Sequence, residues 1–268
     1  MNRWTLGTTG LVLLVLLAGC VGLSPDGDGV PESTPDETLT GTPTDGTTAT
    51  PTRPATPTPT TVVLPPGWSE TGVNDTATVV QGHYAAVLNG APVTVTYRST
   101  VLESAENLTA NTTLAAALDP SERRLVARID ASTSGREVFF ANGTLTRWSP
   151  TNETVLGHSD AEFPRVVRSV DWKVLKSQLL LYELEVSGVV SRDGNAALRY
   201  DVVGVHENAV SRRFGAPESA TGRVVVAETG RVLDIETTVT YTRGEVTYDY
   251  AQTDIGATSV DRPDWLVG

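Results

Sequence analysis

Residues 229–250 read TGRVLDIETTVTYTRGEVTYDY, and this stretch gives the clearest indication of the fold. Its first strand alternates between two faces, with Leu233, Ile235, Thr237, Val239 and Tyr241 on one and Asp234, Glu236, Thr238 and Thr240 on the other. A period of two predicts a β-strand with one buried and one solvated face. Thr229-Gly230 and Arg243-Gly244 bound this strand, and glycine permits the positive φ that hairpin turns need. The stretch therefore predicts neighbouring antiparallel strands.

Alternating segments elsewhere extend the pattern. Near the C-terminus, residues 183–191 and 197–205 flank Asp193-Gly194, and residues 222–228 precede Thr229-Gly230. Earlier in the chain, strands are expected at residues 93–98, 111–118, 125–130, 137–141 and 144–148, with turns at Asp119-Pro120 and Asn142-Gly143. Asn-Gly between two alternating runs is a strong hairpin signal. We therefore expect antiparallel meanders.

One helix is expected before the first strand. Asn74 or Asp75 is its N-cap and Asn89-Gly90 its end. Its apolar stripe consists of Val79, Val80, Tyr84, Val87 and Leu88.

A second helix is expected over residues 163–182, with Pro164 in its first turn. Its apolar stripe is Val167, Val170, Val174, Leu175 and Leu181, and its basic residues are Arg165, Arg168, Lys173 and Lys176. Two interpretations are open: a helix packed across a sheet with a solvated basic face, or a basic amphipathic flap that meets lipid head groups. Such a stripe is typical of a core-facing helix, so the first is favoured.

The order helix, strands, helix, strands predicts an α+β fold. Its single curved antiparallel sheet, a half-barrel, has an apolar face that two helices cover. Residues 65–268 form this domain, which is long enough for one sizeable core.

Cys20 is the only cysteine, and it follows Leu17-Ala18-Gly19 at the end of an apolar run. A short, weakly basic start with Arg3 precedes that run, so residues 1–19 are typical of a signal peptide. The string resembles a lipobox, which implies lipidation of Cys20 and cleavage before it. The alternatives are an uncleaved membrane helix over residues 6–23 and an ordinary thiol. We expect an exported protein, anchored by lipid to the outer face of the cell membrane.

Residues 20–64 are expected to form a disordered linker. Between Ser33 and Thr61 the chain consists almost wholly of Thr and Pro with a few Gly, Ala and acidic residues. Proline favours extended backbone and removes hydrogen-bond donors, so this composition cannot bury a core.

The chain is acidic, with 20 Lys and Arg against 32 Asp and Glu, a net charge of -12. Lys173 and Lys176 are its only lysines. An acidic surface with arginine in place of lysine is similar to proteins of extreme halophiles, and the alternative is an acidic extracellular domain. Nucleic acid is excluded as an expected partner, because no basic stripe is present to neutralise phosphates.

N-glycosylation sites are predicted by five Asn-x-Ser/Thr motifs. They begin at Asn74, Asn107, Asn111, Asn142 and Asn152.

The order of elements in a chain with a lipobox resembles the LolA and LppX superfamily of lipoprotein carriers and lipid-binding lipoproteins. The similarity is greatest at residues 229–250 and Pro263. The chain also resembles a haloarchaeal lipoprotein family of unknown function, through the lipobox, the Thr-Pro linker, Leu64-Pro65-Pro66-Gly67 and Arg262-Pro263-Asp264-Trp265. The resemblance implies a half-open barrel closed by helices, with a hydrophobic groove for a lipid chain. A core filled by side chains is the alternative, and no ligand-binding residue is assigned.

Catalytic and metal motifs do not emerge from the sequence. His83, His158 and His206 lie far apart and share no ligand spacing, and His83 lies beside the apolar stripe of the first helix. His158, Asp160 and Glu162 form a cluster in an expected loop, which is a weak metal signal in an acidic chain. G-x-S-x-G, phosphate-binding glycine loops and H-E-x-x-H are absent. We expect no enzyme, no cofactor and no metal site.

Two functions follow from these observations. The first is a surface lipoprotein that binds a lipid or another hydrophobic ligand in a groove between sheet and helices. The second is a structural, sensor or protein-interaction module of the cell envelope without a small ligand.

Overall fold

The computed structural model describes residues 63–103, 108–131, 134–206, 209, 211 and 214–266. Cys20, the predicted signal peptide and nearly all of the predicted linker lie outside these residues. Within the described part of the chain, no helix is both long and apolar enough to cross a membrane.

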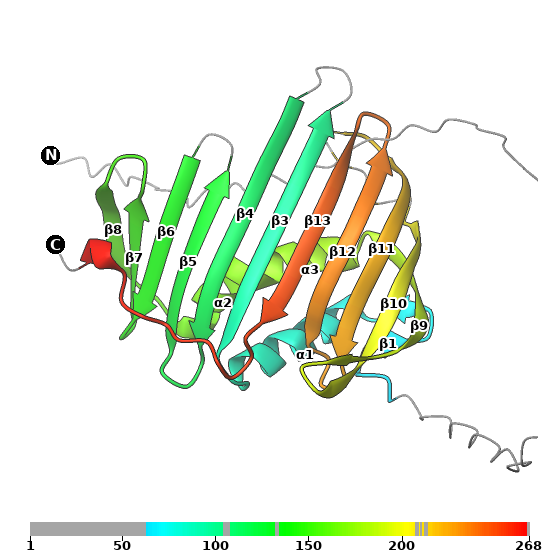
Figure 1. The fold of residues 1–268 in the computed structure, drawn as a ribbon, viewed down its shortest axis with the longest axis horizontal. Helices are drawn as coiled ribbons and strands as arrows, with labels where there is room; N and C mark the ends of the chain where they lie inside the picture. Colours follow the sequence, from blue (N-terminus) through cyan, green and yellow to red (C-terminus); the bar gives the residue numbers. More distant parts are fainter. Residues whose placement is uncertain are drawn as a thin grey trace, which may run out of the picture. The chain divides into compact units, whose positions relative to one another are not determined.

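Eleven of the described strands form one antiparallel sheet (Figure 1). Its first meander comprises β3 (Val93–Glu103), β4 (Leu108–Asp119), β5 (Arg124–Ala131), β6 (Ser134–Ala141), β7 (Thr144–Ser149) and β8 (Thr154–Asp160). Its second comprises β9 (Tyr182–Arg192), β10 (Asn195–Val205), β11 (Pro217–Ala227), β12 (Val232–Tyr241) and β13 (Gly244–Thr253). The strand order is β8-β7-β6-β5-β4-β3-β13-β12-β11-β10-β9, so the two meanders meet at β3 and β13. The prediction of a single antiparallel sheet is confirmed.

Turn chemistry sets the hairpins. Asn142 and Gly143 have φ of 51° and 79°, and Asp193 and Gly194 have φ of 50° and 79°. Two consecutive positive φ values match the right-handed twist of the strands that they join. Both hairpins therefore form where the sequence predicts them.

α1 (Thr76–Leu88) begins at the predicted place. Asp75 is the N-cap, and its Oδ1 accepts hydrogen bonds from the backbone N–H groups of Ala77 and Thr78. Asn74 is therefore not the cap, and Asn89 is the C-cap. Val79, Val80 and Val87 of the predicted stripe are buried.

The second helical region differs from the continuous helix expected over residues 163–182. It consists of α2 (Phe163–Val167), a π-helical turn η1 (Arg168–Trp172) and α3 (Lys173–Leu179), and Tyr182 begins β9. The wider π turn adds a residue to the helical repeat and so changes which side chains face inward. Asp171, in this turn, is buried with 2% of its surface exposed.

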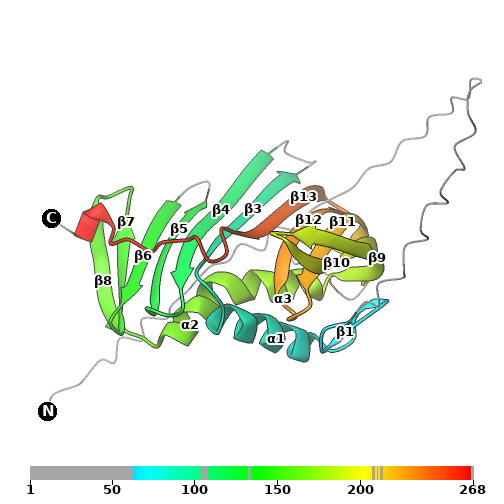
Figure 2. The same ribbon diagram turned by 60° about the horizontal axis from the view of Figure 1, so that its bottom comes forward.

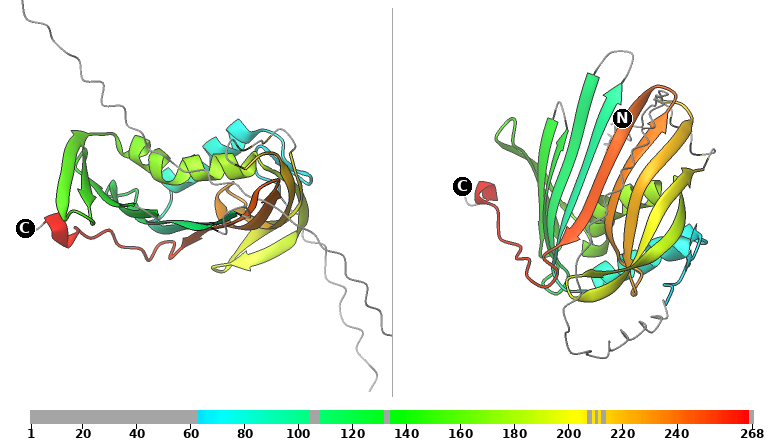
Figure 3. Two further views of the ribbon diagram at one scale, coloured as in Figure 1. Left: turned by 90° about the horizontal axis from the view of Figure 1, so that it is seen from above. Right: turned by 45° about the vertical axis from the view of Figure 1, so that its right-hand side comes forward.

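The connection from β8 to β9 has to cross the sheet, because these two consecutive strands are its opposite edges. α2, η1 and α3 make that crossing, and α1 lies on the same side of the sheet (Figures 2 and 3). The fold is therefore α+β, with its helices on one face. We call this the inner face.

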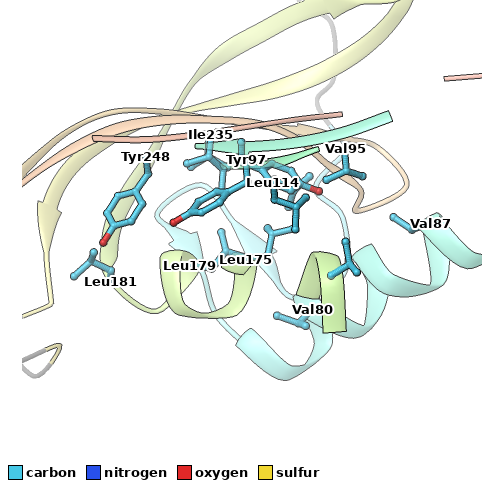
Figure 4. Close-up of a cluster of buried hydrophobic side chains, with 14 of the residues drawn as sticks. Val80, Val87, Val95, Tyr97, Leu114, Leu175, Leu179, Leu181, Ile235 and Tyr248 are labelled. Carbon is cyan, nitrogen blue, oxygen red and sulfur yellow. The ribbon is translucent and has the colours of Figure 1, made fainter. Parts of the chain in front are cut away.

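The main core lies between these helices and the inner face. Leu175 and Leu179 of α3 lie beside Tyr97, Leu114 and Ile235 of the sheet (Figure 4). Side chains therefore fill the space beneath α3, as the filled-core alternative requires for this part of the domain.

Two local predictions were wrong. Leu233 does not share the face of Ile235, because a β-bulge beside Val226 places it in a separate cluster with Ala197 and Val225. His158 and Asp160, which were expected in a loop, lie on β8. The entry to the domain also contains a short hairpin, β1 (Trp68–Ser69) and β2 (Gly72–Val73).

Candidate functional site

A pocket of about 830 Å³ opens where α1 ends and α2 begins. The helices contribute Leu88 and Phe163, and the sheet side contributes Phe140 and the turns around Pro120 and Asn142. The volume lies within the range of small-molecule sites, whereas the lining is more polar than is usual for them. The pocket thus lies at the boundary between sheet and helices, at one end of the filled core.

Two aromatic rings form the apolar floor of this pocket. The centroids of Phe140 on β6 and Phe163 at the start of α2 are 5.7 Å apart, with the ring planes tilted by 41°. Both residues are almost fully buried, which fixes the distance between α2 and the sheet. Pro164 follows in the first turn of α2, where its missing N–H leaves no intrahelical bond unmade.

The rim of the pocket is polar. Glu122 and Arg123 come from the β4–β5 turn, and Glu162 precedes α2. Asn142, one of the predicted glycosylation sites, also lines the pocket and is exposed. An apolar floor with a charged rim suits an amphiphilic ligand better than a fully apolar one.

A second cluster of polar side chains lies inside the core. Nε2 of His83 and Oδ2 of Asp171 are 2.8 Å apart, and the Tyr250 hydroxyl donates to Oδ1 of Asp171 at 2.7 Å. The backbone N–H of Val232 donates to Nδ1 of His83 at 3.0 Å. Because Nδ1 is an acceptor, the proton of the neutral imidazole is on Nε2, which donates to Asp171.

Two further residues close this cluster into a ring. Gln252 Nε2 donates to the Tyr250 hydroxyl at 2.7 Å, and Arg231 Nε donates to Gln252 Oε1. Arg231 directly precedes Val232, which is already bonded to His83. We call the set His83, Asp171, Tyr250, Gln252 and Arg231 the polar ring.

Burial governs the electrostatics of the polar ring. It raises the pKa of Tyr250 well above its usual value, and the neighbouring carboxylate of Asp171 adds to that effect. Burial also lowers the pKa of Arg231. Neither shift prepares a group for chemistry at neutral pH, because both residues keep their ordinary protonation state there.

The polar ring is best understood as structural. Its five side chains are between 0% and 6% exposed, and none of them lines the pocket. They connect α1 and η1 to β12 and β13, so their hydrogen bonds hold the helices on the sheet. Of these residues, only His83 was predicted from the sequence to lie near the core. Asp171 could have been predicted as well, because it lies four positions after Val167 on an apolar stripe.

The other two histidines lie apart from the ring. His158 on β8 is exposed, and its Nδ1 is 2.9 Å from Thr146 Oγ1. His206 Nδ1 is 3.7 Å from Glu183 Oε1, with both side chains about half exposed. Over the described part of the chain, three metal-ligating side chains do not come together at any point.

The predicted modification sites fall into two groups. Asn74, Asn111, Asn142 and Asn152 are exposed. Asn107 and Cys20 lie outside the described residues. Glycosylation and lipidation remain predictions.

Comparison with known proteins gives structural similarities only. No protein-family model and no curated protein matches the sequence. LprF from Mycobacterium bovis is 13% identical, with a TM-score of 0.38 over 72% of this chain and 98% of that one. Lipoprotein LppX from Mycobacterium tuberculosis is 12% identical, with a TM-score of 0.31 over 69% and 97%. A LolA superfamily protein from Nitrosomonas europaea is 9% identical, with a TM-score of 0.27 over 70% and 95%.

Proposed function

We propose that this protein is an exported lipoprotein, anchored to the outer face of the cell membrane through Cys20, that binds the hydrocarbon part of an amphiphile without catalysis. The pocket at the junction of α1 and α2 is the observation that carries the proposal. Leu88, Phe140 and Phe163 give the pocket its apolar lining, and its volume of about 830 Å³ is in the range of small-molecule sites.

The sequence supports the setting of this function. A signal peptide with a lipobox would place the domain outside the cell, and the Thr-Pro linker would hold it away from the membrane surface. The acidic, lysine-poor composition favours surroundings rich in salt, as in halophilic archaea.

A second candidate is a structural or protein-interaction module of the envelope without a small ligand. The filled core beneath α3 favours it, because that space leaves no room for a chain. The two candidates differ in whether the pocket takes up an apolar molecule.

Blocking the pocket tests the proposal. Ala161 lines it and is partly buried, so Ala161→Trp places a large ring in the space, whereas Ala257→Trp adds the same ring at an exposed position. All proteins in this test carry Cys20→Ser, so that they have no attached lipid and need no detergent. Calorimetric titration with n-dodecanol measures binding, and native mass spectrometry detects retained lipid. We expect binding to the parent protein and to Ala257→Trp, and about a tenfold or greater loss in Ala161→Trp.

Two outcomes count against the proposal. Absence of both retained lipid and n-dodecanol binding in the parent protein would leave the interaction module as the better function. Equal affinity of a folded Ala161→Trp protein would place the ligand elsewhere. Circular dichroism and thermal unfolding establish that each variant is folded.

A further inference from the structure

Most arginines on the described strands of the sheet are paired with acidic neighbours on the outer face. On β5, Arg128 contacts Asp130 at 2.6 Å and Glu137 at 3.3 Å. On β10, Arg199 contacts Asp201 at 2.8 Å. In an acidic chain such pairing is easily satisfied, because carboxylates outnumber cations.

Arg136 and Arg147 depart from this pattern because the register places them on the inner face. Arg136 on β6 is opposite Ile129, which in turn is opposite the core residue Leu114. Arg147 on β7 is opposite the core residue Val138. Residues opposite each other point to the same side of a sheet, so both guanidinium groups lie on the side of the helices and the core.

Both arginines are partly buried, and neither forms an ion pair with a described residue. Their opposite residues, Ile129 and Val138, are apolar. A partly desolvated cation without a counter-charge is unfavourable, and an anion that approached it would recover free energy. The two residues are diagonal neighbours across β6 and β7, a separation that long side chains bridge.

The two arginines are also close to the pocket floor. Along β6, Val138 is two residues from Phe140 and Arg136 is four residues from it, and alternate residues share a face. At about 3.3 Å per residue, Val138 with its partner Arg147 lies about 7 Å from Phe140, and Arg136 about 13 Å. Neither arginine lines the pocket, and the buried Val138 lies between Phe140 and Arg136 on this face, so the two arginines lie along β6 and β7 beyond the pocket. A head group meets both guanidinium groups if the amphiphile extends from the pocket along the inner face past Val138.

We propose that Arg136 and Arg147 form a subsite for the anionic head group of the bound amphiphile, a phosphate or a carboxylate. This proposal rests on the proposed function, because it concerns the head group of the same bound amphiphile. Guanidinium groups suit both anions, since their N–H groups donate in pairs to two oxygens. In a chain with a net charge of -12, these cations would select for a head group that the rest of the surface repels.

The test compares two ligands with the same hydrocarbon chain, n-dodecyl phosphate and n-dodecanol. Calorimetric titration is done below the micelle concentration of the phosphate and below the solubility limit of the alcohol. The full chain carries Cys20→Ser throughout, so that attached lipid does not contribute. The test variant is Arg136→Gln with Arg147→Gln. The matched control is Arg98→Gln with Arg243→Gln, which removes two exposed arginines at positions away from the subsite and gives the same net charge.

We expect the parent chain and the control to bind n-dodecyl phosphate about ten to a hundred times more tightly than n-dodecanol. The test variant should bind the two ligands about equally and keep its affinity for n-dodecanol. The advantage of the phosphate should also decrease with added salt, as for other partly exposed charge contacts. Inorganic phosphate alone should bind more weakly than n-dodecyl phosphate, because it lacks the chain.

Each contrary result has a separate meaning. Equal affinity of the parent chain for both ligands would overturn the head-group subsite and leave the proposed function intact. If the test and control variants lose affinity for n-dodecyl phosphate equally, the effect is one of net charge, and this result would also overturn the head-group subsite. Inorganic phosphate as strong as n-dodecyl phosphate would show a free-anion site in its place. If neither amphiphile binds, the proposed function fails first and the subsite with it.

Discussion

Nε2 of His83 on α1 and Oδ2 of Asp171 in the π turn η1 lie 2.8 Å apart, although 88 residues separate them in the chain. Both side chains are 2% exposed. Around this contact the polar ring ties two helical segments to β12 and β13, so the packing of helices on the sheet depends on buried hydrogen bonds as well as on apolar contacts.

Asp171→Ala should destabilise the protein by about 3–5 kcal/mol. The change leaves buried donors on His83 and Tyr250 without an acceptor and removes the negative charge of the polar ring. Asp130→Ala is the control, since this carboxylate pairs with Arg128 at the surface. Its removal should lower the free energy of unfolding by less than about 1 kcal/mol. Urea unfolding measures both, and similar losses would contradict the structural role of the ring.

Tyr97 should make the protein less stable at alkaline pH. Burial raises the pKa of Tyr97 to about 12, above its usual value of 10.0. Because the pKa is higher in the folded state, the neutral Tyr97 contributes fully to the free energy of unfolding below pH 10. This contribution is lost as the pH rises from 10 towards 12, by about 1.4 kcal/mol per pH unit. The stability difference between the parent protein and Tyr97→Phe should therefore shrink between pH 9 and pH 11. Urea unfolding at several pH values checks it, and a constant difference would refute it.

Trp265 fastens the C-terminal segment to the outer face. This segment crosses the sheet on the side opposite the helices (Figure 1), and the rings of Trp265 and Trp148 stack at 5.6 Å. Trp265 Nε1 also donates to Glu137 Oε2 at 2.6 Å. Trp265→Ala should lower the free energy of unfolding by about 2 kcal/mol and accelerate hydrogen exchange in β6 and β7. Trp265→Phe keeps a stacking ring but lacks the N–H donor, so its stability should lie between those of the parent protein and Trp265→Ala. Unaltered hydrogen exchange in Trp265→Ala would contradict the role of Trp265 in holding the C-terminal segment on the sheet.

Cys20→Ser should release the protein from membranes or leave its precursor uncleaved. The hydroxyl of serine does not replace the thiol to which the lipid would be attached. Membrane fractionation and the intact mass of the processed chain measure the two effects. Unchanged membrane retention together with normal processing would refute lipidation.

The local features of the fold could be predicted from the sequence, because each depends on residues close together in the chain. Asn142-Gly143 and Asp193-Gly194 provide the positive φ values of two hairpins, and Asp75 provides the cap of α1. Leu233 shows where this reasoning ends. A β-bulge there depends on how β12 pairs with β11, and alternation along a single strand does not reveal it.

The candidate site was less accessible to sequence reasoning. A groove between sheet and helices was expected from resemblance, but no lining residue was assigned. Phe140 and Phe163 meet because β6 and α2 pack together, and Arg136 and Arg147 share a face because of the register between β6 and β7. Neither relationship follows from spacing in the chain.

The sequence by itself determined the hairpins at Asn142-Gly143 and Asp193-Gly194, the approximate limits of α1 and the acidic composition, since short-range turn chemistry and composition decide them. Only the tertiary structure decided how the two meanders join. Tyr97 on β3 pairs with Tyr250 on β13, and this pairing brings the edge strands β8 and β9 to opposite ends of one sheet. α2 and α3 must then cross the inner face, which buries Asp171 against His83 and leaves the pocket at the end of the crossing. Such long-range contacts depend on the packing of the whole chain, because no local pattern specifies which distant strands pair.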